Sequence, residues 1–278
     1  MDIVASKITG INYKDENMMQ LVYASRTGGN AVSHSIFQIF PQDKKRQLSK
    51  CGFQIVSDWS FRLFIEEYER HEAHRANDFY RQISGVPRAA SLWGNVFELK
   101  VLHHIDTCGG RKFQIRGLSS PSIITWKCPA PIRRYTFVRE ADFIREITKA
   151  VKEDKSLHLV PSAPNFEAVD SIIYTPNEVL TCIQATVSGE HAISVPGLQR
   201  IQNWLGTEPP LAVLRPEPHR PWRLIFIVPP GDASTYEIQQ FNKDTKKGEW
   251  ANSEKVLQYV LGLDVLEKIQ NDNLGGSS

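Results

Sequence analysis

Residues 164–188, PNFEAVDSIIYTPNEVLTCIQATVS, contain two apolar runs on either side of a short polar turn, and each run carries one polar residue. The Val and Ile content of the runs predicts two β-strands, and the TPNE turn predicts that they form a hairpin. The polar residues are Asp170 and Gln184, which are 14 residues apart. At the hairpin end away from the turn, their side chains can meet. Polar groups at the ends of interior strands are a common way to build a metal or catalytic site.

The rest of the chain alternates between helical and strand-like segments. Apolar residues at helical spacing predict helices at residues 57–84, 88–105, 139–154, 196–206 and 253–270. Short apolar runs predict strands at residues 19–26, 33–42, 111–118, 122–129, 156–162 and 222–230, with residues 235–242 beside the last of these. This order predicts an α/β fold with a mixed central sheet flanked by helices, and the hairpin at 164–188 in the middle of the sheet.

The length of 278 residues permits one large domain or two small ones. We expect a strand-containing segment at residues 1–56, a main domain at residues 57–272 and a flexible tail at residues 273–278, because the chain ends in GGSS.

The composition excludes some classes of protein. A net charge of +2 does not by itself indicate a nucleic-acid partner, so any basic surface must be local. The four cysteines form no CxxC pair, which argues against a zinc finger and favours a reducing compartment. No signal peptide and no membrane-spanning run is visible, so we expect an intracellular protein outside the membrane.

The basic run at residues 44–50, KKRQLSK, is either a solvated loop, a nuclear-targeting signal or a phosphate contact.

Polar residues of three predicted elements form a candidate metal site. Glu98 lies on the helix at 88–105, Asp170 and Gln184 lie on the hairpin strands, and Thr186 follows Gln184 with one residue between them. Two carboxylates together with the backbone carbonyl of Ala185 would provide the hard oxygen ligands that Mg²⁺ prefers. Such a metal ion can orient a water molecule and stabilise charge on a phosphate.

The segments SLWGNVFE, PNFEAVDSIIY and IQATVSGEH resemble the nuclease domain of fungal Crinkler-type and retrotransposon-hot-spot-type proteins. That domain belongs to the PD-(D/E)xK, restriction-endonuclease-like superfamily. The resemblance runs from about residue 57 to residue 265. It implies a Mg²⁺- or Mn²⁺-dependent nuclease that acts on DNA, or alternatively on RNA, in an effector-like protein with the nucleus as a candidate compartment.

Larger relatives carry a P-loop ATPase before this domain. The chain has no G-x-x-x-x-G-K-[ST] motif, so residues 1–56 are interpreted as a remnant of such a module or a segment that partners it.

The resemblance also assigns roles to individual residues. It makes Glu98 the helix acid, Asp170 the metal-binding acid and residues 184–186 the counterpart of the (D/E)xK triplet.

The triplet departs from the family pattern at both of its functional positions. Gln184 replaces a carboxylate by a neutral amide, and Thr186 replaces the lysine that would steady the attacking water or the phosphate. His191, as an auxiliary base, or Lys100 could take over from that lysine. The departure also leaves open a second function, in which the fold has lost catalysis and binds nucleic acid or a host protein.

Each of these residues has a simpler explanation that stays open. Glu98 could be a solvated helix acid, Asp170 could cap a turn, and Gln184 with Thr186 could form a polar ladder on one strand face. The basic residues expected to contact nucleic-acid phosphates could equally be solvated surface; they are Arg133, Arg134, Lys149, Lys152 and Arg200. The helical histidines are expected to lie on the surface; they are His71, His74, His103 and His104.

Overall fold

The computed structural model describes residues 37–41, 51–55, 58–86, 89–120, 122–162, 166, 168–242 and 254–266. The chain divides into two compact units, Met1–Leu99 and Lys100–Ser278. This division falls within helix α5 (Ala90–Thr107), whereas the sequence predicted a boundary near residue 56, and that boundary stays a prediction.

The first unit contains a two-stranded antiparallel sheet, in which β1 (Phe37–Pro41) pairs with β2 (Cys51–Ile55). It also contains the long helix α4 (Asp58–Ser84), which confirms the helix predicted at 57–84. Phe61, Phe64 and Tyr68 of α4 are buried and follow one another at helical spacing, with ring centroids 6.4 and 6.2 Å apart. This apolar stripe explains why the segment is helical.

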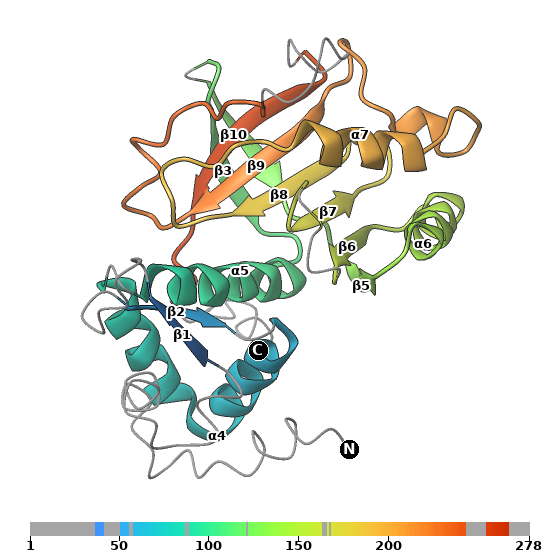
Figure 1. Cartoon of the computed structure of the whole chain (residues 1–278). Helices are drawn as coiled ribbons and strands as arrows, with labels where there is room; N and C mark the ends of the chain where they lie inside the picture. The colour runs from blue at the N-terminus through green and yellow to red at the C-terminus, as the bar shows by residue number, and fades with distance from the viewer. Residues whose placement is uncertain are drawn as a thin grey trace, which may run out of the picture. The chain divides into compact units, whose positions relative to one another are not determined.

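The second unit is built around an eight-stranded mixed sheet with the order β4-β3-β10-β9-β8-β7-β6-β5 (Figure 1). The strands are β3 (Lys112–Gly117), β4 (Ile123–Lys127), β5 (Arg133–Phe137), β6 (Leu157–Pro161), β7 (Ser171–Tyr174), β8 (Thr181–Ala185), β9 (Trp222–Val228) and β10 (Val256–Gly262). The pairs β5–β6, β8–β9 and β9–β10 are parallel, and the other pairs are antiparallel. The predicted α/β fold with a mixed sheet flanked by helices is confirmed.

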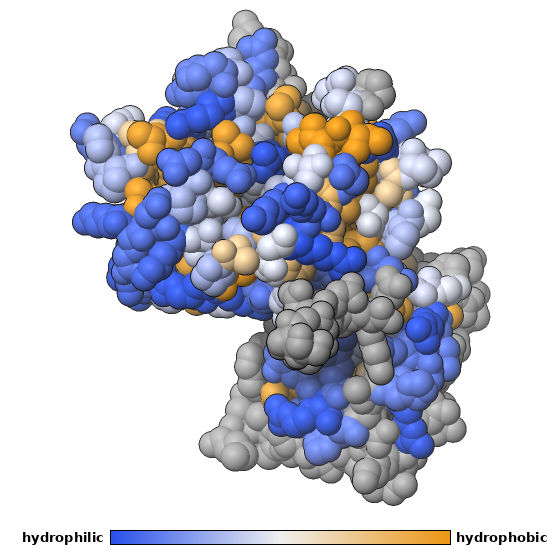
Figure 2. All heavy atoms as spheres, turned by 180° about the vertical axis from the view of Figure 1, so that it is seen from behind, coloured by the Kyte–Doolittle hydropathy of each residue, from blue (hydrophilic) through white to orange (hydrophobic). Residues whose placement is uncertain are grey.

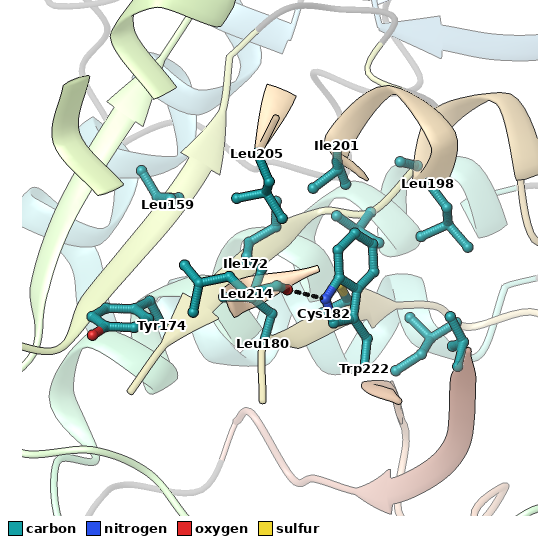
Figure 3. Packing of buried hydrophobic residues seen from close by; sticks show 14 of the residues in the cluster. Leu159, Ile172, Tyr174, Leu180, Cys182, Leu198, Ile201, Leu205, Leu214 and Trp222 are labelled. Atoms are coloured by element: carbon teal, nitrogen blue, oxygen red, sulfur yellow. Dashed lines mark hydrogen bonds between the residues drawn. The ribbon is translucent and has the colours of Figure 1, made fainter. Parts of the chain in front are cut away.

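Two helices pack against one face of this sheet. They are α6 (Glu140–Glu153) and α7 (Val195–Trp204), whose buried side chains join one apolar cluster with alternate residues of the central strands (Figure 1). Figure 3 shows part of this cluster around Trp222, which is 1% exposed and donates a 2.7 Å hydrogen bond from its indole N–H to the carbonyl oxygen of Leu214. The last turns of α5 pack against the other face, where the ring of His104 lies 6.0 Å from that of Phe113.

The hairpin of β7 and β8 has the register that its sequence predicts. Ser171 pairs with Ile183 and Ile173 with Thr181, and the turn is closed by a 3.1 Å hydrogen bond from the Glu178 N–H to the Thr175 carbonyl. Asn177 adopts a φ of 62°, a left-handed conformation that asparagine tolerates better than most residues. Every residue of both strands is buried, in agreement with their apolar composition.

Three sequence predictions about the sheet were wrong or incomplete. Residues 253–270 were expected to form a helix, but residues 256–262 form β10, which runs parallel to β9 over seven residue pairs. Residues 235–242 were expected to form a strand beside residues 222–230, but they form irregular structure with one isolated bridge, and β9 is flanked by β8 and β10. Strand β5 was not predicted. The strand predicted at residues 19–26 and the basic run at 44–50 lie outside the described residues.

Among the described helices, none combines the length and the apolar character needed to cross a membrane. Figure 2 shows hydrophilic side chains over much of the described surface on one face, interrupted by hydrophobic patches. The described cysteines Cys108, Cys128 and Cys182 are buried free thiols.

Candidate functional site

Asp170 and Gln184 meet at the open end of the β7–β8 hairpin, as the sequence predicted. The amide nitrogen Nε2 of Gln184 lies 2.9 Å from each carboxylate oxygen of Asp170 and donates to both. The backbone N–H of Ala185 donates a further hydrogen bond of 2.7 Å to Oδ2 of Asp170. Gln184 is 8% exposed and Asp170 is half-buried, so the pair lies at the edge of the core. The carboxylate therefore accepts three N–H contacts from the neighbouring strand.

Thr186 does not contribute its hydroxyl to this pair. Its backbone N–H continues the parallel ladder by donating to the carbonyl of Ile227 at 2.9 Å. Its side-chain oxygen accepts a 3.0 Å hydrogen bond from the backbone N–H of Ser188. Thr186 thus closes the turn that follows β8.

His191 lies beside Phe226, the residue of β9 that pairs with Gln184. The two ring centroids are 6.4 Å apart, and the ring planes are inclined at 62°. Burial lowers the pKa of His191, which favours the neutral imidazole near pH 7. The auxiliary-base role of His191 stays a prediction.

Gln239 holds the loop that carries His191, a role that sequence analysis missed. Its side-chain oxygen accepts a 2.6 Å hydrogen bond from the backbone N–H of His191, and its amide nitrogen donates to the carbonyl of Gly189 at 3.2 Å. Gln239 is itself fixed by Gln258 of β10, whose side chain bonds both the N–H and the carbonyl of Gln239 at 2.8 and 3.0 Å. Residues 235–242 were expected to form a strand, so Gln239 was not recognised as a residue that holds a loop.

The described residues around Asp170 do not fit a Mg²⁺ ion in their present arrangement. Both carboxylate oxygens of Asp170 accept hydrogen bonds from the Gln184 amide, which directs a positive dipole where a cation would have to bind. Within the described part of the chain, no three His, Cys, Asp or Glu side chains are grouped to hold a metal ion. Glu98 is a half-buried residue of α5 in the first unit, so its place in a metal site stays a prediction.

The basic residues predicted to contact nucleic acid lie in three different settings. Arg133 begins β5 and forms a 2.9 Å ion pair with Glu146 of α6, and Arg134 forms a 2.8 Å ion pair with Asp106. Lys149 and Lys152 lie on α6, and Arg200 is exposed on α7. Arg133, Lys149 and Lys152 share one region of the surface, because they line two hollows that have Lys149 in common.

A polar cluster of Asp106, Arg134 and the buried His158 joins the end of α5 to the sheet, and sequence analysis missed it. Asp106 accepts the Arg134 ion pair and also lies 2.6 Å from Nδ1 of His158, a fully buried residue of β6. Burial alone would raise the pKa of Asp106, but the hydrogen bonds and charges of His158 and Arg134 outweigh it and lower this pKa. Asp106 and His158 are far apart in the chain, so no local pattern could reveal the pair.

The prediction that all four helical histidines lie on the surface was wrong for one of them. His104 is 7% exposed and packs against Phe113, and burial with the nearby Arg111 lowers its pKa. His71, His74 and His103 are exposed. A buried histidine of this kind is an ordinary core residue, because the amphipathic face of α5 turns it towards the sheet.

Comparison of the chain with protein-family models, with curated proteins and with solved structures finds no match. The function is therefore argued from the site itself.

Proposed function

We propose that the second unit is a restriction-endonuclease-like module that binds nucleic acid without cleaving it. The observation that carries this proposal is the hydrogen bonding of Asp170, whose two oxygens both accept from the Gln184 amide. The Gln184 amide and the Ala185 N–H give both carboxylate oxygens a hydrogen-bond donor without a cation, and so stabilise Asp170 as a structural residue at the end of two strands.

Two further observations support the fold and the ligand class of the proposal. The pairing of β7 with β8 places Asp170 beside Gln184 and Ala185, and the chain continues through α7 into β9, which is parallel to β8. The resemblance expects the metal-binding acid and the triplet to be neighbours of this kind. Helix α6 carries four acids and three bases, but the three bases, Arg145, Lys149 and Lys152, line one hollow in which Glu153 is the single carboxylate, which gives the local positive charge that binding to phosphates requires.

A Mg²⁺-dependent nuclease is the competing candidate. It is favoured by the register, since Asp170 lies opposite Gln184 and in hydrogen-bonding contact with Ala185. Burial also lowers the pKa of His191, whose ring lies beside Phe226, the strand partner of Gln184. It requires the Gln184 amide to turn away from Asp170 and a second carboxylate to complete the ligand set.

Plasmid cleavage in millimolar Mg²⁺ or Mn²⁺ separates the two candidates. The test compares the wild type with Asp170→Asn, which keeps an acceptor for the Ala185 N–H, and with Asp232→Asn as a control at an exposed turn. We expect no cleavage by any of the three proteins, and salt-dependent binding of a labelled oligonucleotide by all three.

Cleavage by the wild type and Asp232→Asn that is lost in Asp170→Asn would establish the nuclease and overturn the proposal. Equal cleavage by all three would indicate a contaminating enzyme. The binding half of the proposal fails if the wild type binds no oligonucleotide at low salt, where electrostatic binding is strongest.

A further inference from the structure

A cleft of about 480 Å³ opens between the start of β5 and the C-terminal end of α6. One part of its lining is apolar and consists of residues 130–132 together with Ala150 of α6. Another part is cationic and consists of Arg133, Lys149 and Lys155. A cleft with an apolar side and a few convergent polar groups is the usual form of a small-ligand site.

The lining of the cleft also holds two carboxylates, Glu153 and Asp154. Lys149 and Lys155 both lie against Glu153, whereas Arg133 is paired with Glu146 at 2.9 Å. Nζ of Lys155 lies 3.0 Å from Oε2 of Glu153, and Nζ of Lys149 lies 4.0 Å from Oε1. The hydrogen bond from Lys155, with the charges of Lys155, Lys149 and Arg133, lowers the pKa of Glu153. The Glu153 side chain is 39% exposed, so an anion from solution can reach the same position.

A second hollow of about 400 Å³ shares Lys149 and Glu153 with the cleft and extends along α6. It adds Arg145 and Lys152, which lie on the same helix face as Lys149 because their spacings are four and three residues. Arg145 is held by ion pairs of 2.8 and 3.0 Å to acids of its own helix, Asp142 and Glu146. The two hollows adjoin at Lys149 and Glu153 and form one track, lined by five cations and by the carboxylates of Glu153 and Asp154.

The register of the sheet places this track away from Asp170. Arg133 pairs with Leu157, and Leu157 pairs with Tyr174, at one end of the strands. Asp170 precedes Ser171 at the other end of β7. Four residues of extended strand separate the two ends, a distance of about 13 Å. The cleft is therefore a different site from the Asp170–Gln184 pair.

We propose that the cleft binds the phosphate of a nucleotide, and that Glu153 holds the position of this phosphate in the free chain. The proposal rests on the proposed function, which makes a nucleic-acid strand the source of the phosphate. A phosphate offers more acceptor oxygens to Arg133, Lys149 and Lys155 than one carboxylate does, and the apolar side of the cleft fits a sugar or a base. The adjoining hollow on α6 would receive the next phosphate of the strand.

The experiment measures binding of a labelled single-stranded oligonucleotide by fluorescence anisotropy between about 50 and 200 mM salt. The cleft variant Lys149→Met/Lys155→Met is compared with Lys112→Met/Lys127→Met, which removes two exposed lysines that face each other on β3 and β4. Both changes lower the net charge equally. Because the Lys149 and Lys155 side chains are 55% and 72% exposed, the cleft variant should fold.

We expect the cleft variant to lose at least tenfold in affinity and to reduce the slope of log Kd against log salt by about 1 to 1.5, since each single-strand phosphate contact accounts for roughly 0.7. The control should stay within about twofold of the wild type. Glu153→Gln should bind several-fold more tightly than the wild type, because it removes the anion that competes with the phosphate. A purely structural Glu153 would give no gain.

Two probes, inorganic phosphate and a mononucleotide, identify the source of the phosphate in competition and calorimetry. If the oligonucleotide binds and the cleft variant matches the control, this proposal is overturned and the proposed function stands. If the oligonucleotide does not bind but the mononucleotide binds to the wild type and not to the cleft variant, the proposed function fails and the cleft is a nucleotide site. If none of the probes binds, both are overturned.

Discussion

Replacing Gln184 by glutamate tests the contact on which the functional argument depends. In the wild type, the amide nitrogen of Gln184 lies 2.9 Å from both oxygens of Asp170. Gln184→Glu removes these donors and places two carboxyl groups in contact at a site that is 8% exposed at position 184. The folded protein can avoid the repulsion between two carboxylates by keeping one proton in the pair.

The free-energy cost of keeping that proton bound at pH 7 sets the size of the destabilisation. A glutamate with an unperturbed pKa of about 4.3 must stay protonated at pH 7, a difference of about 2.7 pH units or about 4 kcal/mol. The folded state then binds more protons than the unfolded state, so the penalty decreases by about 1.4 kcal/mol for each pH unit below 7 and disappears near pH 4. For a folding unit of the size of Lys100–Ser278, we expect the Tm to fall by about 8 to 16 °C at pH 7.

Thermal and urea unfolding at pH 7 and pH 4.5, in the presence of a chelator, measure this effect. The matched control is the swap Asp170→Asn/Gln184→Glu, which restores one amide and one carboxylate and should recover most of the stability at pH 7. If Gln184→Glu unfolds within about 0.5 kcal/mol of the wild type at pH 7, the two side chains are not in contact and the reasoning fails. Recovery of the variant by millimolar Mn²⁺ would instead favour the metal-dependent nuclease, because a ligand stabilises the state that binds it.

Two other substitutions test the packing on either side of the sheet. Asp106→Asn should destabilise the protein by about 2 to 4 kcal/mol at pH 7, because it removes the charge that is hydrogen-bonded to the buried His158 and paired with Arg134. Since the folded pKa of Asp106 is lowered, its stabilisation is present above about pH 4 and is lost as the pH falls through the folded pKa, so urea unfolding of the variant and the wild type should converge in acid. Gly197→Ala should cost about 1 to 3 kcal/mol, because the new Cβ would lie 2.5 Å from Cβ of Ala168, whereas Gly189→Ala, with open space around it, should leave the Tm nearly unchanged.

The β7–β8 hairpin and its polar pair could be predicted because their information is local. Alternation and β-branched residues define each strand, the TPNE turn fixes the register, and the register brings Asp170 opposite Gln184. The predicted helices at 57–84, 139–154 and 196–206 were confirmed for the same reason, since a helix depends on contacts within its own segment.

Strand β10 could not be predicted because its conformation depends on a distant partner. Val256, Val260 and Leu261 are all buried, and their spacing fits a helix as well as a strand. The parallel pairing with β9 over seven residue pairs decides between the two, and the partner strand lies more than thirty positions earlier in the chain. Asp106 and His158 were missed for the same reason, because their contact is created only when α5 packs on the sheet.

The two ends of the sheet carry chemically different sites, and this separation affects how a functional test must be interpreted. The predicted phosphate contacts Arg133 and Lys149 gather at the end of the strands opposite to Asp170. Exposed charges about 13 Å apart are beyond the screening length of about 8 Å at physiological salt, so a substitution at one end should leave the other almost unaffected. The Lys149→Met/Lys155→Met variant could lose oligonucleotide binding while the stability of the Asp170–Gln184 pair stays unchanged. That result would assign binding to α6 and a structural role to the pair. If Gln184→Glu weakened binding at a pH and temperature where it is fully folded, the strand would have to pass over both ends, and Asp170 would regain a direct role at the nucleic acid.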